Sequence, residues 1–209
     1  MTVAITNSNA WATTVGANSS FSFTATGNYV IVAVAKRGTN SIPTVTYGGV
    51  SMTGVGAQGN SSQNFIYIFG LLNPLSGAQT VSVTNGGTTV DHGTFACSLS
   101  GVNSTPIDAL DSNVGGSLSL TTTVPGCGIF HFANAGTAVV NSNNLAASTN
   151  LTNIDNTSGA YIAARGTTFP QVSAGAITTE VTAAGFTIAS VSFAIAPAPS
   201  NTGSFFMLM

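Results

Sequence analysis

Short runs of β-forming residues, separated by Gly, Asn, Ser and Pro, follow one another along the chain of 209 residues. Runs such as YVIVAVA, FIYIFGLL and TIASVSFAIA have the length and composition of strands, and helical periodicity is essentially absent. Turn-forming pairs such as Gly48-Gly49 stand between the runs, where positive φ is often needed. The pattern predicts an all-β, mainly antiparallel fold.

Two kinds of run indicate stacked sheets. TIASVSFAIA alternates, which predicts Ser190 and Ser192 on a solvated face and Val191 and Phe193 on a buried face. YVIVAVA and FIYIFGLL are apolar on both sides, as in strands that are covered on each face. We therefore predict a two-sheet β-sandwich, jelly-roll-like, that occupies residues 1–196 as one domain, followed by a Pro-containing connector and apolar tail over residues 197–209. The predicted core consists of Phe21, Phe23, Val32, Val34, Phe65, Tyr67, Val81, Val83, Phe95, Phe130, Phe132, Val191 and Phe193.

The surface carries very little charge. Charged residues make up 4% of the chain, against about 25% in a typical protein, while the hydrophobic share of 44% is ordinary. The three basic residues, Lys36, Arg37 and Arg165, cannot neutralise several phosphates, so nucleic-acid binding is excluded. Charge keeps free proteins apart in solution, so this surface favours either a subunit of an assembly or a protein that lives at high salt.

The sequence shows no targeting or membrane segment. The N-terminal MTVAITNSNAW lacks the basic and long apolar regions of a secretory signal, and no run has the length of a transmembrane helix. We expect a chain made in the host cytoplasm without a signal peptide, with no membrane partner.

Three stretches are familiar in combination: NYVIVAVAKRG, VTYGGVSMTGVG, and FGLLNPLSGAQTVSVTNGG followed by FACSLSGVNSTPID. Together they resemble a β-sandwich module of phage structural proteins that is also found in some secreted bacterial proteins. The resemblance covers residues 20–110. It implies a jelly-roll or related sandwich and, in phages, a part of the virion surface such as a capsid decoration protein, a fibre or a spike. No catalytic residue comes with it.

Candidate catalytic and metal-binding groups are few. Asp108 and Asp111 are the only carboxylates close together in sequence, and they lie in a stretch that looks like a loop. They are interpreted as turn-capping residues, with a calcium site as the alternative. Asp91-His92 resembles half of a catalytic triad, but no G-x-S-x-G motif accompanies it, and no polar set converges on His131. We predict a protein that is not an enzyme and has no cofactor.

The two cysteines, Cys97 and Cys127, lie in apolar runs. They are either a disulfide or two buried thiols, and the second interpretation is favoured. With two distant histidines they supply no recognised zinc spacing.

Trp11 is the one aromatic residue in a polar segment, and a glycan contact would begin there. Tyr29, Tyr47 and Tyr67 lie within apolar runs and are predicted to belong to the core.

The chain closes on an apolar segment, where water would normally favour polar residues. An exposed apolar cluster usually marks an interaction site, so the segment is predicted to insert into a neighbouring subunit. Folding back onto its own sandwich is the alternative. The predicted assembly residues are Phe205, Phe206, Met207, Leu208 and Met209.

These observations favour a non-enzymatic viral structural protein on the virion surface, such as a capsid decoration or cement subunit. The expected partners are copies of itself, as a homo-oligomer and in the first place a trimer, and other virion proteins such as the major capsid protein. Two alternatives stay open: a carbohydrate-binding module or adhesin that binds a glycan receptor, and a self-assembling filament subunit.

Overall fold

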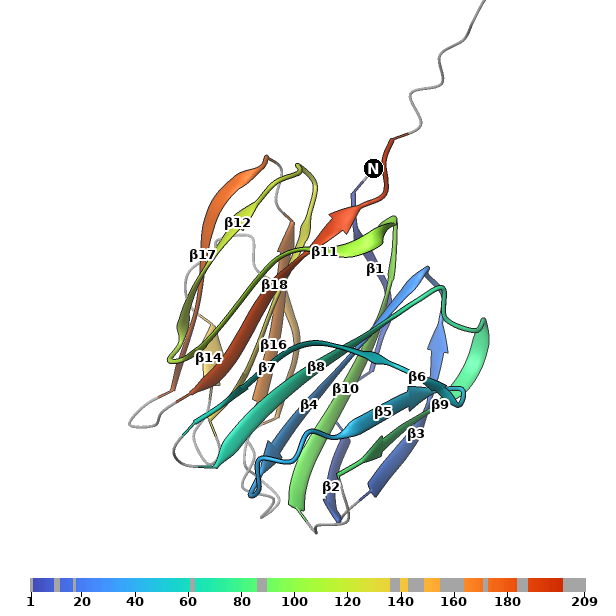
Figure 1. The fold of residues 1–209 in the computed structure, drawn as a ribbon, viewed down its shortest axis with the longest axis vertical. Coiled ribbons are helices and arrows are strands. Elements are labelled where there is room, and N and C mark those ends of the chain that lie inside the picture. The colour runs from blue at the N-terminus through green and yellow to red at the C-terminus, as the bar shows by residue number, and fades with distance from the viewer. Residues whose placement is uncertain are drawn as a thin grey trace, which may run out of the picture.

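The computed structural model of the chain consists of antiparallel β-sheets stacked in four layers (Figure 1). It describes residues 2–9, 12–16, 18–60, 63–85, 90–135, 140–142, 149–154, 164–170, 173–183 and 188–200. Every strand in these ranges belongs to an antiparallel pair, and no helix occurs in them. The predicted all-β antiparallel sandwich is confirmed.

The first half of the chain forms two sheets. The outer N-terminal sheet has the order β3-β9-β5-β6 and consists of β3 (Asn18–Ala25), β9 (Gly77–Thr84), β5 (Thr44–Tyr47) and β6 (Val50–Ser51). The inner N-terminal sheet has the order β1-β10-β4-β8-β7, with β2 also paired to β10, and consists of β1 (Ala4–Ser8), β2 (Ala12–Gly16), β10 (Val90–Ser100), β4 (Tyr29–Arg37), β8 (Asn64–Leu72) and β7 (Thr53–Gly59).

The second half forms two more sheets. The inner C-terminal sheet has the order β11-β18-β13-β16-β15 and consists of β11 (Val102–Val114), β18 (Ala189–Pro197), β13 (Gly128–Asn134), β16 (Ala164–Pro170) and β15 (Thr149–Ile154). The outer C-terminal sheet has the order β12-β17-β14 and consists of β12 (Ser117–Thr122), β17 (Gly175–Ala183) and β14 (Val140–Ser142).

The two halves share one strand order. Replacing β1, β3, β4, β5, β7, β8, β9 and β10 by β11 to β18 in sequence converts both N-terminal orders into both C-terminal orders, with β2 and β6 as additions. The chain therefore holds two sandwiches in tandem, and the change from one to the other falls at Gly101. Four sheets replace the predicted two, because both inner sheets need cover on both faces. Jelly-roll connectivity stays a prediction.

Among the described residues, three apolar cores lie between the four layers. The first lies between the two N-terminal sheets, the second between the two inner sheets, and the third between the two C-terminal sheets. Strand β4 feeds two of them, because Val30, Val32 and Val34 face the first core while Ile31 and Ala33 face the second. This confirms that YVIVAVA is covered on both faces. The predicted core residues are buried, except that Phe21 is partly buried beside the first core.

The predicted solvated face of β18 is wrong. Ser190 and Ser192 are fully buried, because the outer C-terminal sheet covers them. Their hydroxyls donate to backbone carbonyls, Ser190 to Gly115 and Ser192 to Phe130 at 3.2 Å. Small polar side chains with satisfied hydrogen bonds can thus line an interior and still give an alternating pattern.

The predicted loop around Asp108 and Asp111 is also wrong, since residues 102–114 form β11, which pairs with β18. As the first strand of its sheet, β11 leaves most of its residues at least partly exposed, and its register shifts twice, around Ile107. An exposed, bulged edge strand does not require alternating apolar residues, which removes the sequence signal.

The turn prediction at Gly48-Gly49 is confirmed. These residues join β5 to β6 with φ of 56° and 81°. Both values lie in the region that favours glycine, as a two-residue hairpin turn requires. The corresponding pair at Gly86 lies outside the described residues.

Replacing Phe193 by Ala should reveal how much the second core contributes. Phe193 is fully buried, and its ring stacks on Phe130 and Phe132 with centroids 5.5 and 6.1 Å apart. We expect the free energy of unfolding in urea to fall by about 3–5 kcal/mol, the range for Phe-to-Ala changes in cores. The control is Leu110→Ala, whose side chain pairs across from Phe193 but is 46% exposed, with an expected loss below about 1 kcal/mol. Equal losses in the two variants would contradict this assignment.

Candidate interaction site along strand β7

Strand β7 ends the inner N-terminal sheet. It pairs with β8 on one side, and no other strand of the described chain pairs with its outer edge. Its sequence, TGVGAQG, contains neither charge nor proline, and all its residues are exposed or partly exposed. Proteins usually protect a free edge with charged side chains or proline, because unpaired N–H and C=O groups attract other strands. A β-bulge also protects an edge, and β7 has one at Val55.

The edge is held close to the C-terminal half. A Cβ atom at Gly56 would lie 2.8 Å from Cγ1 of Val191 and 3.0 Å from Cδ1 of Leu110. Glycine at this position therefore lets the backbone of β7 approach β18 and β11. Leu110 is itself 46% exposed, so an apolar side chain borders the edge.

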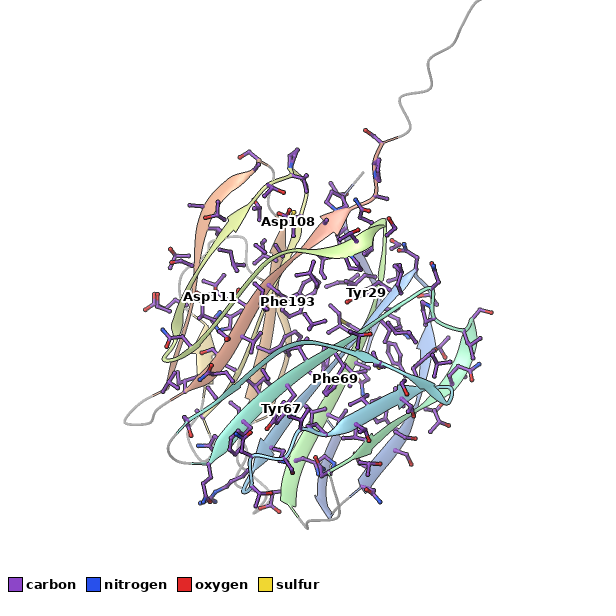
Figure 2. All side chains as sticks on the ribbon, in the orientation of Figure 1. Tyr29, Tyr67, Phe69, Asp108, Asp111 and Phe193 are labelled. Atoms are coloured by element: carbon purple, nitrogen blue, oxygen red, sulfur yellow. The ribbon has the colours of Figure 1, made fainter. Side chains whose placement is uncertain are left out.

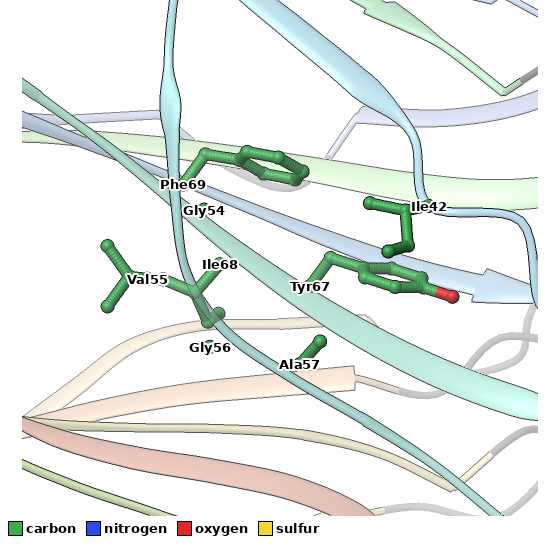
Figure 3. Close-up of a pocket in the computed structure, with 8 residues that line it drawn as sticks. All are labelled: Ile42, Gly54, Val55, Gly56, Ala57, Tyr67, Ile68 and Phe69. Atoms are coloured by element: carbon green, nitrogen blue, oxygen red, sulfur yellow. The ribbon is translucent and has the colours of Figure 1, made fainter.

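One apolar hollow, here called the Ile42 hollow, adjoins β7 on the side of the first core (Figure 3). Its volume is about 230 Å³. The rings of Tyr67 and Phe69 come from β8, and Ile42 reaches over from the β4–β5 connection. The lining residues are Ile42, Gly54, Val55, Gly56, Ala57, Tyr67, Ile68 and Phe69.

Ile42 is 71% exposed, and partly buried polar contacts fix the loop that carries it. The Lys36 ammonium donates to the carbonyl and the hydroxyl of Ser41, at 2.6 and 2.8 Å. The hydroxyl of Tyr67 donates to Oδ1 of Asn40 at 3.0 Å. Burial lowers the pKa of Lys36 from its usual value and raises that of Tyr67 to about 12. The loop is thus tied to two strands of the inner sheet.

A second hollow, here called the Tyr29 hollow, adjoins β7 on the side of the second core. Its volume is about 400 Å³. Burial, and then the neighbouring Cys97, raise the pKa of Tyr29 to about 12, so this hydroxyl stays neutral at ordinary pH. The lining residues are Tyr29, Thr53, Gly54, Val55, Gly70, Leu72, Ser104, Pro106 and Ile107.

The two hollows suit apolar side chains rather than acid–base chemistry. Neither is lined by a carboxylate, a histidine or a lysine. Gly54 and Val55 line both, so the edge of β7 runs between them. Sequence analysis missed this site, because a Gly-rich strand carries little β-propensity and its hollows belong to distant segments.

Ser19, His92 and Asn85 form a polar row that resembles a triad, with His92 and Asn85 buried and Ser19 partly exposed. His92 Nε2 lies 2.7 Å from Oγ of Ser19, and His92 Nδ1 lies 3.2 Å from Nδ2 of Asn85. With the Asn85 amide in this orientation its Nδ2 donates to Nδ1, so a neutral His92 ring carries its proton on Nε2, beside the serine. A general base needs the opposite tautomer, with Nε2 free to accept the serine proton. Asp91, the predicted triad partner next in sequence, takes no part in this row.

His131 lies in another row, in register with Ser192 and Asp111 on three adjacent strands. Serine stands between the acid and the histidine, whereas a triad has histidine in the middle. His131 is 1% exposed, and neither ring nitrogen has a hydrogen-bond partner in the described part of the chain. Burial lowers the pKa of His131 to about 4, although the negative charge of Asp111 acts to raise it.

His131 should make the protein sensitive to acid. Its pKa is about 4 when folded and 6.5 in the reference state, so the unfolded chain binds the proton more tightly. Stability is therefore complete above pH 6.5 and falls as the pH drops toward 4, by on the order of 3 kcal/mol. We expect His131→Leu to lose correspondingly less stability than the wild type between pH 7 and 4, measured by urea unfolding. The carboxylates titrate in both proteins and affect both equally. An equal loss of unfolding free energy in the wild type and the variant would therefore contradict the prediction.

The structure places Asp108 and Asp111 on β11 and directs each carboxylate to a donor on or just after β12 (Figure 2). Asp108 accepts from the backbone N–H of Thr123 at 2.7 Å and from the Thr123 hydroxyl. Asp111 accepts from the N–H of Ser119 at 2.9 Å. The Cys127 thiol lies 3.6 Å from Asp108, and burial with this carboxylate raises the thiol pKa to about 12.

Replacing Asp108 by Asn should test the two interpretations of this carboxylate. Loss of a charged acceptor for two Thr123 groups should lower the free energy of unfolding by about 1–3 kcal/mol. Ser112→Ala on exposed β11 surface is the control. A chelator should leave the melting temperature of the wild type unchanged. A chelator-induced drop in the wild type that Asp108→Asn abolishes would favour the calcium alternative. Within the described residues, no cluster of three or more His, Cys, Asp or Glu side chains is present.

The remaining predicted residues fall into two groups. Cys97 and Cys127 are buried free thiols, which settles the choice between a disulfide and thiols. Tyr29, Tyr47 and Tyr67 are buried, as predicted. Trp11 and the segment Phe205, Phe206, Met207, Leu208 and Met209 lie outside the described residues.

Comparisons of the chain with protein-family models, with curated proteins and with solved structures gave no match. Among the described residues, no helix is long and apolar enough to span a membrane.

Proposed function

We propose that this protein is a non-enzymatic structural subunit of a virion surface, of the kind that decorates a capsid, and that it works through contacts between copies. The observation that carries the proposal is the outer edge of β7. This strand stands at the end of its sheet, contains no charged residue and lies between two apolar hollows. An edge of this kind attracts another strand unless it is covered. A protein that stays alone gains nothing from such an edge.

The composition supports the same conclusion. Charged residues make up 4% of the chain, and the net charge is −2, so repulsion between copies is weak. Exposed Ile42, Leu75 and Leu110 add apolar area to the surface. The expected partners are other copies, as a trimer, and virion proteins such as the major capsid protein, on the virion surface.

Polar geometry favours a structural protein over an enzyme. The two histidines of the chain are buried; His92 contacts Asn85 and Ser19, and burial lowers the pKa of His131 to about 4. The rival hypothesis, a glycan-binding module, gains no support from Tyr29, Tyr47 and Tyr67, because buried rings offer no platform for a sugar.

Removing the apolar segment should separate folding from assembly. We expect the wild type to elute as an oligomer in size-exclusion chromatography with light scattering, while a variant lacking residues 203–209 keeps its β-sheet circular dichroism and its melting temperature but elutes mainly as a monomer. The reason is that the described cores are built from residues up to Ile195, so they do not require residues 203–209. A wild type that stays monomeric at every concentration would sink the proposal, and mass-spectrometric counting on purified particles would locate the protein.

A further inference from the structure

We infer that the outer edge of β7 is the acceptor for the apolar segment Phe205–Met209 of a second copy of this chain, which adds to the inner N-terminal sheet as a further strand. The inference rests on the proposed function and gives it a contact. Strand addition supplies main-chain hydrogen bonds along the edge, while pockets on the two faces take alternate side chains.

The edge has the form that such an addition requires. No other strand of the described chain pairs with its outer side. Thr53, Gly54 and Ala57 are exposed and small, so another backbone can approach closely. The Ile42 hollow and the Tyr29 hollow lie on opposite faces of the sheet, beside the first and second cores.

The segment matches the edge in chemistry and in length. Successive side chains of a strand point to opposite faces, so FFMLM would send apolar side chains to both hollows at once. Five extended residues span about 17 Å, and the seven residues of β7 span about 24 Å. Neither β7 nor the segment FFMLM contains a charged side chain that would have to be buried.

The exit of the chain favours a second copy over the same copy. Ala198 still donates to the carbonyl of Gly101, at 2.6 Å, but Pro199 and Ser200 are exposed. In Figure 1 the chain leads away from the four layers past the end of β18. Proline at 197 and 199 stiffens the chain in this direction, which favours presentation of the following residues to a neighbouring copy.

Charging the edge tests the acceptor. Thr53→Lys with Ala57→Lys places one charge beside each hollow, and Ser117→Lys on exposed β12, at the edge of the outer C-terminal sheet, is the matched control. We expect the double variant to keep the wild-type melting temperature and to need at least tenfold more protein to assemble in light scattering, while the control assembles like the wild type. Unchanged assembly of the double variant, with loss on deleting residues 203–209, would overturn the acceptor while the proposed function stands. Loss in the double variant without loss on deletion would mean that β7 pairs with something else.

Cross-linking tests the same contact without relying on disruption. One preparation carries Ala57→Cys and the other Leu208→Cys, and the native Cys97 and Cys127 are buried, so the background reaction is low. Mixing them under oxidising conditions should give a disulfide-linked dimer, whereas Ser117→Cys with Leu208→Cys should not. A synthetic peptide of residues 203–209 should also slow amide exchange of residues 53–59 in the tail-deleted protein. Absence of both the cross-link and this protection would refute the inference. A variant that carries both cysteines and cross-links within its own chain, while the mixed preparations do not cross-link, would refute it as well.

Discussion

The packing of the two inner sheets against each other is the constraint on which the rest of the structure depends. Their shared core contains Phe95 from one half and Phe130, Phe132 and Phe193 from the other. A sheet that is apolar on both faces must be covered on both faces. Each inner sheet therefore needs an outer sheet in addition to the other inner sheet, and this gives four layers. The stack gives large apolar burial to a chain that has almost no charge.

The same stack explains where polar groups go. Ser190, Ser192 and His92 are buried between layers. The two serine hydroxyls donate to backbone carbonyls, and the His92 ring contacts a serine hydroxyl and an amide. Asp108 and Asp111 bind the outer C-terminal sheet to β11 instead of projecting into a cleft. Polar side chains of the described residues therefore hold sheets together, in agreement with the proposal that contacts at the edge of β7 carry the function.

The tandem strand order bears on how this edge arises. In the C-terminal half, β15 stands where β7 stands in the N-terminal half, at the end of its inner sheet. The N-terminal edge differs by lying against β11 and β18, where Gly56 leaves room for Val191 and Leu110. Packing of one half against the other thus creates the walls of the Tyr29 hollow, including Pro106 and Ile107, which a single sandwich would lack.

Sequence alone determined the fold class and most of the core, because buried strands such as β4, β8 and β18 are short runs of β-branched and aromatic residues bounded by turn-forming residues. It also determined the scarcity of charge and the apolar segment at residues 205–209. It could not identify β7 or β11, since exposed edge strands rich in glycine or polar residues obey no such pattern. Nor could it reveal that Ser192 is buried or that four sheets are present. An alternating strand with serine on one face has the same sequence whether that face contacts water or a second sheet. Those outcomes depend on which faces meet across long stretches of chain, and only the tertiary structure decides that.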